Sequence, residues 1–231
     1  ADQRLAAVVV HSVEDEGNGA NAEVGSRHGF IATAADMERA FRGAWQQAKT
    51  NGVGPDGLTV SNREWLQQLV FCVLDALGLE DNTAGRGAYF EELYEVFAQP
   101  RVWRIFPDVE PVLRGVRARG LHVGVISNWD ARLRPLLDAL GLSARLDSVT
   151  VSCELRCEKP RADIFRAALQ AANINAREAL HVGDALEEDV RGAEAIGMGA
   201  VLLDRAGRHA GNATVVQSLE QIYRVIDGAS G

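Results

Sequence analysis

The stretch HVGDALEEDVRGAEAIGM, residues 181–198, joins the end of a predicted strand to most of a predicted helix. Residues 179–182 form a short apolar run, which a glycine and an aspartate follow. Residues 188–196 have the apolar spacing of an amphipathic helix, and a glycine ends it. A second apolar run comes next, at residues 200–203. This order of strand, polar loop, helix and strand predicts a parallel βαβ unit.

The same alternation fills the chain from residue 105 onward. The other predicted helices there cover residues 108–119, 131–140 and 162–172, and the other predicted strands cover residues 121–126 and 148–152. The opening run, residues 6–13, predicts one more strand. Apolar strands that alternate with amphipathic helices are typical of a parallel sheet with helices on both faces. The predicted fold class is α/β, and the active site is expected outside the carboxyl ends of the strands.

Residues 20–104 have a different texture, with helical periodicity and little strand signal. Thr33 and Asp36 have the spacing of a capping box that opens a helix through residue 47. Further helices are predicted at residues 61–77 and 91–99. Their apolar stripes suit either core packing or the lining of a substrate pocket. We therefore divide the chain into a core, residues 1–16 and 105–231, and a helical insertion, residues 17–104.

The composition excludes several classes of protein. The chain has 231 residues, of which 47% are apolar and 24% charged, so disorder is excluded. A net charge of -8 without a basic stretch argues against a nucleic-acid partner. The longest apolar run, residues 6–10, is far too short to span a membrane. Three cysteines give no disulfide framework, which predicts a reducing compartment. Because the sequence starts at Ala1, processing at the N-terminus is expected, in the cytoplasm or an organelle interior.

Polar side chains follow three of the predicted strands. Ser127 and Asn128 come after the strand at 121–126, and a hydroxyl there can donate a hydrogen bond to a phosphoryl oxygen. Lys159 follows the strand at 148–152 and supplies a cation. Asp184 directly follows residues 179–182 and a glycine, where a carboxylate suits Mg²⁺ beside a phosphate. A plain turn, a solvated loop and acidic complements to a helix dipole are the alternatives at these places.

Three motifs resemble those of the haloacid dehalogenase (HAD) superfamily. They are VISNWDARLRPLL (125–137), EKPRADIF (158–165) and HVGDALEEDVRGAEAIGM, and the helical insertion resembles the subfamily I cap. The strings AEVGSRHGF (22–30), MERAFRGAW (37–45) and SNWDARL (127–133) are similar to a branch that includes HAD-like hydrolase domain-containing protein 3 and rhythmically-expressed-gene-2-like proteins. The resemblance implies a Rossmann-like core, a mobile cap and Mg²⁺-dependent hydrolysis of phosphomonoesters.

The resemblance also implies a role for each matching residue. Ser127 and Asn128 would contact the phosphoryl group, and Lys159 would stabilise the charge of the nucleophile and the phosphate. Asp184 and Asp189 would belong to the metal site.

The first motif departs from the family's pattern. Active members end the first strand in D-x-D, where the first aspartate attacks phosphorus and the second acts as acid and base. Here the run reads AVVVHSV, residues 7–13, so that His11 stands at the nucleophile position and Val13 at the acid/base position. Valine can do neither job, and an imidazole is a softer ligand for Mg²⁺ than a carboxylate. The alternatives are attack by His11 or a displaced nucleophile at Asp15 or Glu14, and the Mg²⁺ site is expected to be weakened or absent.

Three functions follow as hypotheses. The first is a catalytically impaired HAD-fold protein that acts as a structural or regulatory subunit with a protein partner or in a larger assembly. The second is an active Mg²⁺-dependent hydrolase of a small phosphorylated metabolite. The third is a protein that binds a phosphorylated ligand without hydrolysing it.

Overall fold

The computed structural model describes residues 7–10, 13–15, 17–50, 62–79, 83–209, 211 and 213–228, with the backbone alone at 7–10, 13–15, 17–19, 49, 50, 62, 83 and 84. The chain divides into two compact units. One comprises Ala1–Ser12 and Ile105–Gly231, and the other comprises Val13–Arg104. No helix in the described part of the chain combines the length and apolar character needed to span a membrane.

The first unit is built on a six-stranded parallel sheet in the order β5-β4-β1-β6-β7-β8. Its strands are β1 (Ala7–Val10), β4 (His122–Ser127), β5 (Ser148–Val151), β6 (Ala179–Gly183), β7 (Gly199–Leu203) and β8 (Val215–Val216). The central strand β1 pairs with β4 on one side and with β6 on the other. In this register Val10 lies opposite Val182, and Ser127 lies opposite Val151.

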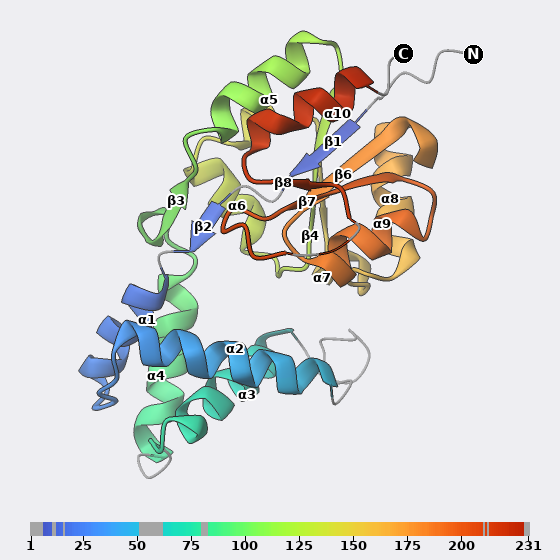
Figure 1. Cartoon of the computed structure of the whole chain (residues 1–231). Coiled ribbons are helices and arrows are strands. Elements are labelled where there is room, and N and C mark those ends of the chain that lie inside the picture. Colours follow the sequence, from blue (N-terminus) through green and yellow to red (C-terminus); the bar gives the residue numbers. More distant parts are fainter. Residues whose placement is uncertain are drawn as a thin grey trace. The chain divides into compact units, whose positions relative to one another are not determined.

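The strands β4 and β5 lie on one side of β1, and β6, β7 and β8 lie on the other. The helices between the strands lie on both faces of the sheet (Figure 1). The helices of this unit are α5 (Val109–Ala118), α6 (Leu133–Ala139), α7 (Ser152–Leu155), α8 (Ala162–Ala172), α9 (Gly192–Glu194) and α10 (Ile222–Gly228). Figure 1 shows α5 and α10 on one face of the sheet and α8 and α9 on the other. Right-handed crossovers require this arrangement when successive strands are added first on one side of β1 and then on the other. The carboxyl ends of β4 and β6 therefore flank that of β1, at the place where α/β folds bind ligands.

The face under α8 has the apolar core that the sequence pattern predicts. Ile164 and Phe165 of α8 are fully buried. They pack with Ile126 of β4, Ala179 of β6 and Met198, which precedes β7. These contacts fix α8, and with it the loop that leads into α8, against the sheet. The predicted α/β fold class is confirmed.

The second unit is helical. Its helices are α1 (Gly17–Arg27), α2 (Ala34–Thr50), α3 (Asn62–Ala76) and α4 (Thr83–Val96). The predicted cap of α2 is confirmed, because the Thr33 Oγ1 accepts a hydrogen bond from the Asp36 N–H at 3.1 Å and donates one to the Asp36 carboxylate at 2.7 Å. The stripes on these helices are buried in two apolar clusters. One contains Val24, Phe30, Leu74, Tyr89, Leu93, Val96 and Val102, and the other contains Met37, Ala44, Trp65, Leu69 and Val73. Core packing therefore accounts for them.

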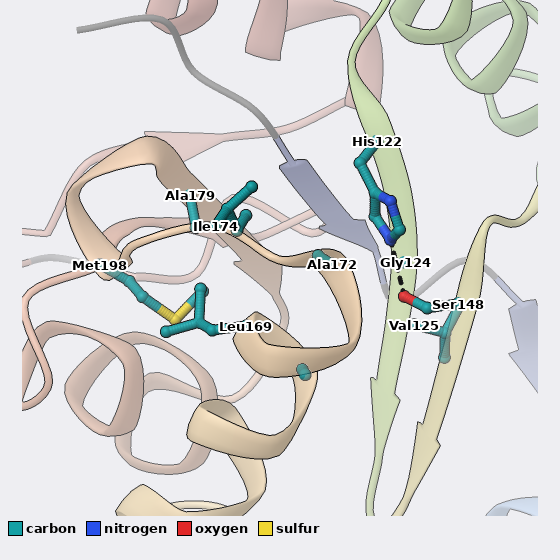
Figure 2. Close-up of a pocket in the computed structure, with 10 residues that line it drawn as sticks. His122, Gly124, Val125, Ser148, Leu169, Ala172, Ile174, Ala179 and Met198 are labelled. Carbon is teal, nitrogen blue, oxygen red and sulfur yellow. Dashed lines mark hydrogen bonds between the residues drawn. The ribbon is translucent and has the colours of Figure 1, made fainter.

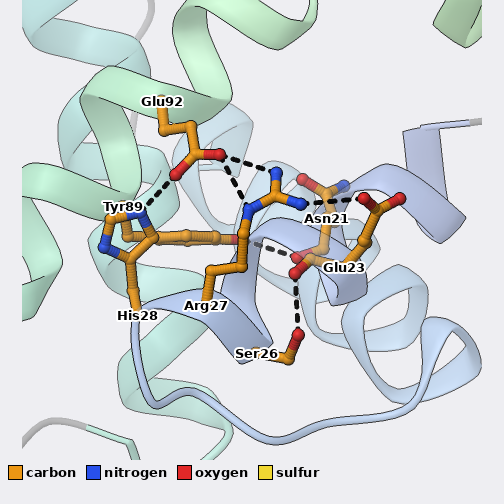
Figure 3. A network of polar contacts seen from close by, with 7 residues as sticks. All are labelled: Asn21, Glu23, Ser26, Arg27, His28, Tyr89 and Glu92. Atoms are coloured by element: carbon orange, nitrogen blue, oxygen red, sulfur yellow. Dashed lines mark hydrogen bonds and ion pairs between the residues drawn. The ribbon is translucent and has the colours of Figure 1, made fainter.

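An ionic network joins the end of α1 to α4 (Figure 3). Glu92 of α4 accepts a hydrogen bond from the Arg27 Nε at 2.9 Å, and its other oxygen lies 2.6 Å from the His28 Nε2. Arg27 also bonds Glu23, one turn earlier, at 2.8 Å. The tip of Tyr89 lies in the same place, with its hydroxyl 3.4 Å from the Asn21 carbonyl. Arg27 and His28 belong to the string AEVGSRHGF, so the structure gives that string a role in joining two helices.

Some predicted elements differ from the structure. The run at 6–13 is not one strand, because β1 ends at Val10 and β2 (Val13–Asp15) pairs with β3 (Trp103–Ile105) in a separate two-stranded sheet. The segment at 13–19 contains β2 and the start of α1. A short strand such as β2 depends on a partner segment far along the chain. The start of α1 was not predicted, because its two glycines have low helix propensity. The last helix of the insertion also begins at Thr83 rather than at residue 91.

Candidate functional site

The predicted site residues meet at one edge of the core sheet. Ser127 is the last residue of β4, and Asp184 comes directly after the last residue of β6. Lys159 lies in the loop between α7 and α8, which follows β5. Because the strands are parallel, their carboxyl ends share this edge. The edge therefore collects polar groups from three βα loops.

A buried ion pair forms the centre of the site. The Lys159 Nζ lies 2.6 Å from the Asp189 Oδ1, and the same oxygen lies 2.9 Å from the His181 Nε2. The other carboxylate oxygen accepts the Ala185 N–H at 3.0 Å. Lys159 is 8% exposed, Asp189 2% and His181 1%. Burial raises the pKa of Asp189, but the hydrogen bond from His181 and the charge of Lys159 outweigh it and hold the pKa below its ordinary value. Asp189 is therefore ionised, and it keeps the ammonium of Lys159 in place.

The backbone around Asp189 has a specific shape. Leu186–Arg191 is a π-helical turn, in which the Val190 N–H reaches back to the Ala185 carbonyl at 3.4 Å. This wide turn directs the Asp189 carboxylate back over the end of β6. A Cβ at Gly183 would lie 2.2 Å from the Asp189 Cγ, so only glycine leaves room for the carboxylate. The sequence predicted an ordinary helix at 188–196, but the structure has this π turn followed by α9. Single π turns are frequent at functional sites.

Asn128 holds the main chain of Lys159. The Lys159 N–H donates a hydrogen bond to the Asn128 Oδ1 at 2.7 Å, and the Asn128 Nδ2 donates one to the Lys159 carbonyl at 3.0 Å. The sequence predicted Asn128 as a phosphate contact. In the structure its side-chain amide bonds the main-chain N–H and carbonyl of Lys159, and it joins the loop after β4 to the loop before α8.

The rest of the loop after β4 is also fixed. The Ser152 hydroxyl lies 3.1 Å from both the Trp129 N–H and the Trp129 carbonyl, which also accepts the Cys153 N–H at 3.2 Å. Asp130 is buried and accepts the Arg132 Nε and Nη2 at 2.9 and 2.6 Å. Several hydrogen bonds thus hold the loop formed by the string SNWDAR in place.

Of the other predicted site residues, the structure describes the side chains of Ser127 and Asp184 but not those of His11 and Val13. Ser127 is half-buried, and its hydroxyl makes no hydrogen bond within the described part of the chain. Asp184 is exposed. His11 lies outside the described residues, and of Val13 only the backbone is described, as the first residue of β2. The predicted nucleophile and acid/base positions therefore rest on the sequence alone.

The described residues do not form a metal site by themselves. Asp184 and Asp189 were predicted as the ligands of a weakened Mg²⁺ site. Asp189 accepts three hydrogen bonds on its two oxygens, and one of them comes from a cation at 2.6 Å. Within the described ranges, no group of three or more His, Cys, Asp and Glu side chains is placed to hold a metal ion. We therefore derive no step that uses the metal.

A small hollow in the same unit lies elsewhere (Figure 2). Its lining includes His122, Ser148 and Ala179, which are the first residues of β4, β5 and β6. It therefore lies at the amino ends of the strands, at the edge opposite to the site. Figure 2 shows the His122 ring bonded to the Ser148 hydroxyl, a contact of 2.8 Å. The lining also includes apolar side chains such as Leu169 and Met198.

Sequence reasoning missed some members of the site. His181 is packed and hydrogen-bonded, and its ring stands edge-on to Phe165, 5.3 Å between centroids. Its contact with Asp189, eight residues later, was not predicted, because the two residues lie in different elements and their spacing therefore matches no helical or strand period. The bidentate pair of Asp130 and Arg132 was also missed, and the spacing of two gives no helical signal for it.

The comparisons with known proteins agree with this architecture. A family model described as haloacid dehalogenase-like hydrolase matches residues 11–197. The haloacid dehalogenase-like hydrolase domain-containing protein 3 of Mus musculus is 35% identical over 178 residues, which cover 76% of this chain and 70% of that protein. A phosphoserine phosphatase of Thermus thermophilus is 37% identical over 119 residues, 51% of this chain and 48% of that protein.

Solved structures show the same fold. The HAD-hydrolase YfnB of Bacillus subtilis, crystallised with magnesium, matches with a TM-score of 0.77 at 15% identity. The match covers 97% of this chain and 99% of that one. The family model and the relative of Mus musculus confirm the sequence resemblance, and the chain belongs to the haloacid dehalogenase-like hydrolase family.

Proposed function

We propose that this protein is a HAD-family phosphate binder that has lost aspartate-based hydrolysis and serves as a structural or regulatory subunit. One observation carries the proposal. The two residues after β1 that would be aspartates in an active phosphatase are His11 and Val13, whereas Ser127, Lys159, Asp184 and Asp189 are all retained. The loss is thus confined to the residues that carry out the chemistry.

The chemistry of these positions supports the proposal. Covalent transfer through an aspartyl-phosphate needs a carboxylate in line with the leaving group. A general acid contributes a further ~10²–10⁴-fold in typical enzymes, and valine cannot supply it. His11 has a nucleophilic nitrogen, but it would replace a hard oxygen ligand with a softer one, so Mg²⁺ binding is proposed to be weak or absent.

The described geometry supports phosphate binding without the metal. The Lys159 cation and the Ser127 hydroxyl come from adjacent loops at one sheet edge. His11 carries no negative charge where the active family members have an aspartate, so an anionic ligand would meet less repulsion from this chain. The ligand would be a small phosphorylated metabolite, and its binding would change the interaction with a protein partner. A reducing cytoplasm or organelle interior is part of the same proposal.

An active phosphatase is the second candidate. It is favoured by the similarity to the phosphoserine phosphatase and to a ribulose-1,5-bisphosphate 5-phosphatase of Halopiger xanaduensis, which is 34% identical over 131 residues. The nucleophile would then be His11 or an acid displaced into β2, such as Asp15. The intact pair of Lys159 and Asp189 is available to such an enzyme.

Hydrolysis of an aryl phosphate with Mg²⁺ separates the candidates. We expect no turnover from the parent protein and turnover from the His11→Asp/Val13→Asp double variant, because the scaffold is retained. Turnover by the parent that disappears in Asp184→Asn would overturn the impaired-protein proposal and support the second candidate. Calorimetric titration with inorganic phosphate, for the parent and for Lys159→Met, tests the binding step separately. Absence of binding in both proteins would contradict the phosphate-binding proposal.

A further inference from the structure

The position of Lys159 is fixed at two points. At its tip, the ammonium is held 2.6 Å from Asp189, whose carboxylate His181 and the Ala185 N–H orient in turn. At its base, the peptide N–H and carbonyl both bond the Asn128 side chain. A lysine side chain is a flexible four-carbon stem, so a fixed ammonium alone is compatible with several positions of the backbone. The two main-chain hydrogen bonds to Asn128 fix the backbone position as well.

The contact at the base is specific to a carboxamide. It needs an acceptor for the Lys159 N–H and a donor for the Lys159 carbonyl, at 2.7 and 3.0 Å, in one planar group. Asn128 supplies both. An aspartate would supply only the acceptor, and an alanine would supply neither. The contact also crosses between loops, because Asn128 follows β4 and Lys159 precedes α8, 31 residues apart.

From this geometry we infer that Asn128 is a positioning residue, which places the Lys159 ammonium for an anionic ligand instead of binding the ligand itself. The inference rests on the proposed phosphate-binding function for its consequence, but its geometry does not depend on a ligand. Asn128 has one further N–H, so direct contact with a phosphate is the competing role. The two roles differ in one respect: a positioning residue affects phosphate affinity only while Lys159 is present, whereas a direct contact affects it with or without Lys159.

The composition makes Lys159 easy to observe. Lysine occurs only at positions 49 and 159, so protein labelled with ¹³C-lysine gives two ε-methylene signals by NMR. The Lys159→Met variant identifies the signal of Lys159. In Asn128→Ala we expect the Lys159 signal to move toward that of free lysine, while the Lys49 signal stays in place. No phosphate is needed for this readout.

Ser152→Ala is the matched control. Ser152 is buried, and its hydroxyl bonds both polar groups of the Trp129 backbone, in the same loop as Asn128. These contacts do not involve Lys159. This variant also removes two hydrogen bonds from the loop. We expect it to lower stability without moving the Lys159 signal. If Asn128→Ala does not fold, Asn128→Asp replaces it, since it keeps the acceptor for the Lys159 N–H and loses the donor.

A double-mutant cycle with inorganic phosphate tests the consequence. We expect Asn128→Ala to weaken phosphate binding roughly tenfold in the parent. In the Lys159→Met background it should add less than about twofold, since the effect passes through Lys159. Additive losses would overturn the inference and assign Asn128 to the ligand. An unmoved Lys159 signal in a folded Asn128 variant would overturn it as well. If the Lys159 signal moves in the Asn128 variant but the parent binds no phosphate, the result would support the positioning role and contradict the proposed function alone.

Discussion

The Lys159 ammonium lies 2.6 Å from the Asp189 carboxylate, and the two side chains form a buried ion pair. Such a pair stabilises little in net terms, because both charges lose water, but breaking it leaves one charge buried without its partner. The retained pair is thus costly to disrupt even where no hydrolysis occurs. This coupling makes stability a direct readout of the site.

Asp189→Asn should destabilise the protein by about 3–5 kcal/mol. The amide keeps the shape of the side chain but leaves the Lys159 cation uncompensated. The free energy of unfolding from urea denaturation measures the change. Glu154→Gln is the control, because Glu154 pairs with Arg134 at the surface, with side chains 40% and 48% exposed. Exposed pairs contribute about 1 kcal/mol or less. Equal losses in the two variants would contradict a buried pair.

Gly183→Ala should displace Asp189. The new methyl group would lie 2.2 Å from the Asp189 Cγ, and the carboxylate has no room to retreat because it is 2% exposed. We expect a loss of about 1–3 kcal/mol from overpacking. Gly43→Ala is the control, since Gly43 lies inside α2 and a methyl group there would meet nothing within 4 Å. At that position alanine should stabilise by up to about 1 kcal/mol. Thermal unfolding of both variants decides the sign.

Acid should weaken the contact between Asp108 and Arg205. Burial raises the pKa of Asp108, but hydrogen bonds from Arg205 at 2.8 and 2.9 Å and from the Leu219 N–H hold the pKa below its ordinary value. The folded pKa is thus lower than the unfolded one. The stabilisation is fully present above the unfolded pKa of about 3.9 and is lost as the pH falls through the folded value.

Asp108→Asn should therefore be less stable at neutral pH, by about 1–3 kcal/mol, and should lose less stability below about pH 4 than the parent. Urea denaturation at a series of pH values measures both effects. Arg205→Ala should produce the same shallower pH dependence, because it removes the other half of the contact. Parallel pH profiles for parent and variants would show that the contact contributes nothing.

The sequence predicted most of the core, because the apolar periodicity within each strand and helix indicates which of its faces is buried. The helix at 162–172 has the predicted bounds, and the strand at 200–203 differs by one residue. The strand β2 is a miss of another kind, because its partner lies far along the chain. Val13–Asp15 becomes a strand only because Trp103–Ile105 lies beside it, some ninety residues later. No local periodicity contains that information.

The site follows the same rule. The place of Ser127, Lys159 and Asp184 at strand ends follows from the parallel topology, so the sequence predicted it. The contacts among side chains do not follow from topology. Asn128 and Lys159 are 31 residues apart, and the π turn that brings Asp189 back over Gly183 has no helical or strand period. His28 and Glu92, 64 residues apart, could likewise not be paired from spacing.

Glu92→Gln should loosen α1 from α4. The hydrogen bond from His28 and then that from Arg27 hold the pKa of Glu92 below its ordinary value, against a smaller effect of burial. Glu92 is therefore charged at neutral pH, and its charge attracts both Arg27 and His28 (Figure 3). Glutamine keeps the length of the side chain but removes the charge. Amides of α1 should then exchange their hydrogens faster, by a factor of about two to five.

Glu91→Gln is the control for that change. Glu91 lies beside Glu92 on α4, but it pairs with Arg63 of α3, so its loss should leave exchange in α1 unaltered. Salt provides a second test, because these side chains are partly exposed and ions screen them. Raising the salt concentration should speed exchange in α1 of the parent and have less effect on Glu92→Gln. If both variants exchange like the parent, apolar packing of Val24 and Phe30 against Tyr89 would be sufficient to hold α1, and the string AEVGSRHGF would need another explanation.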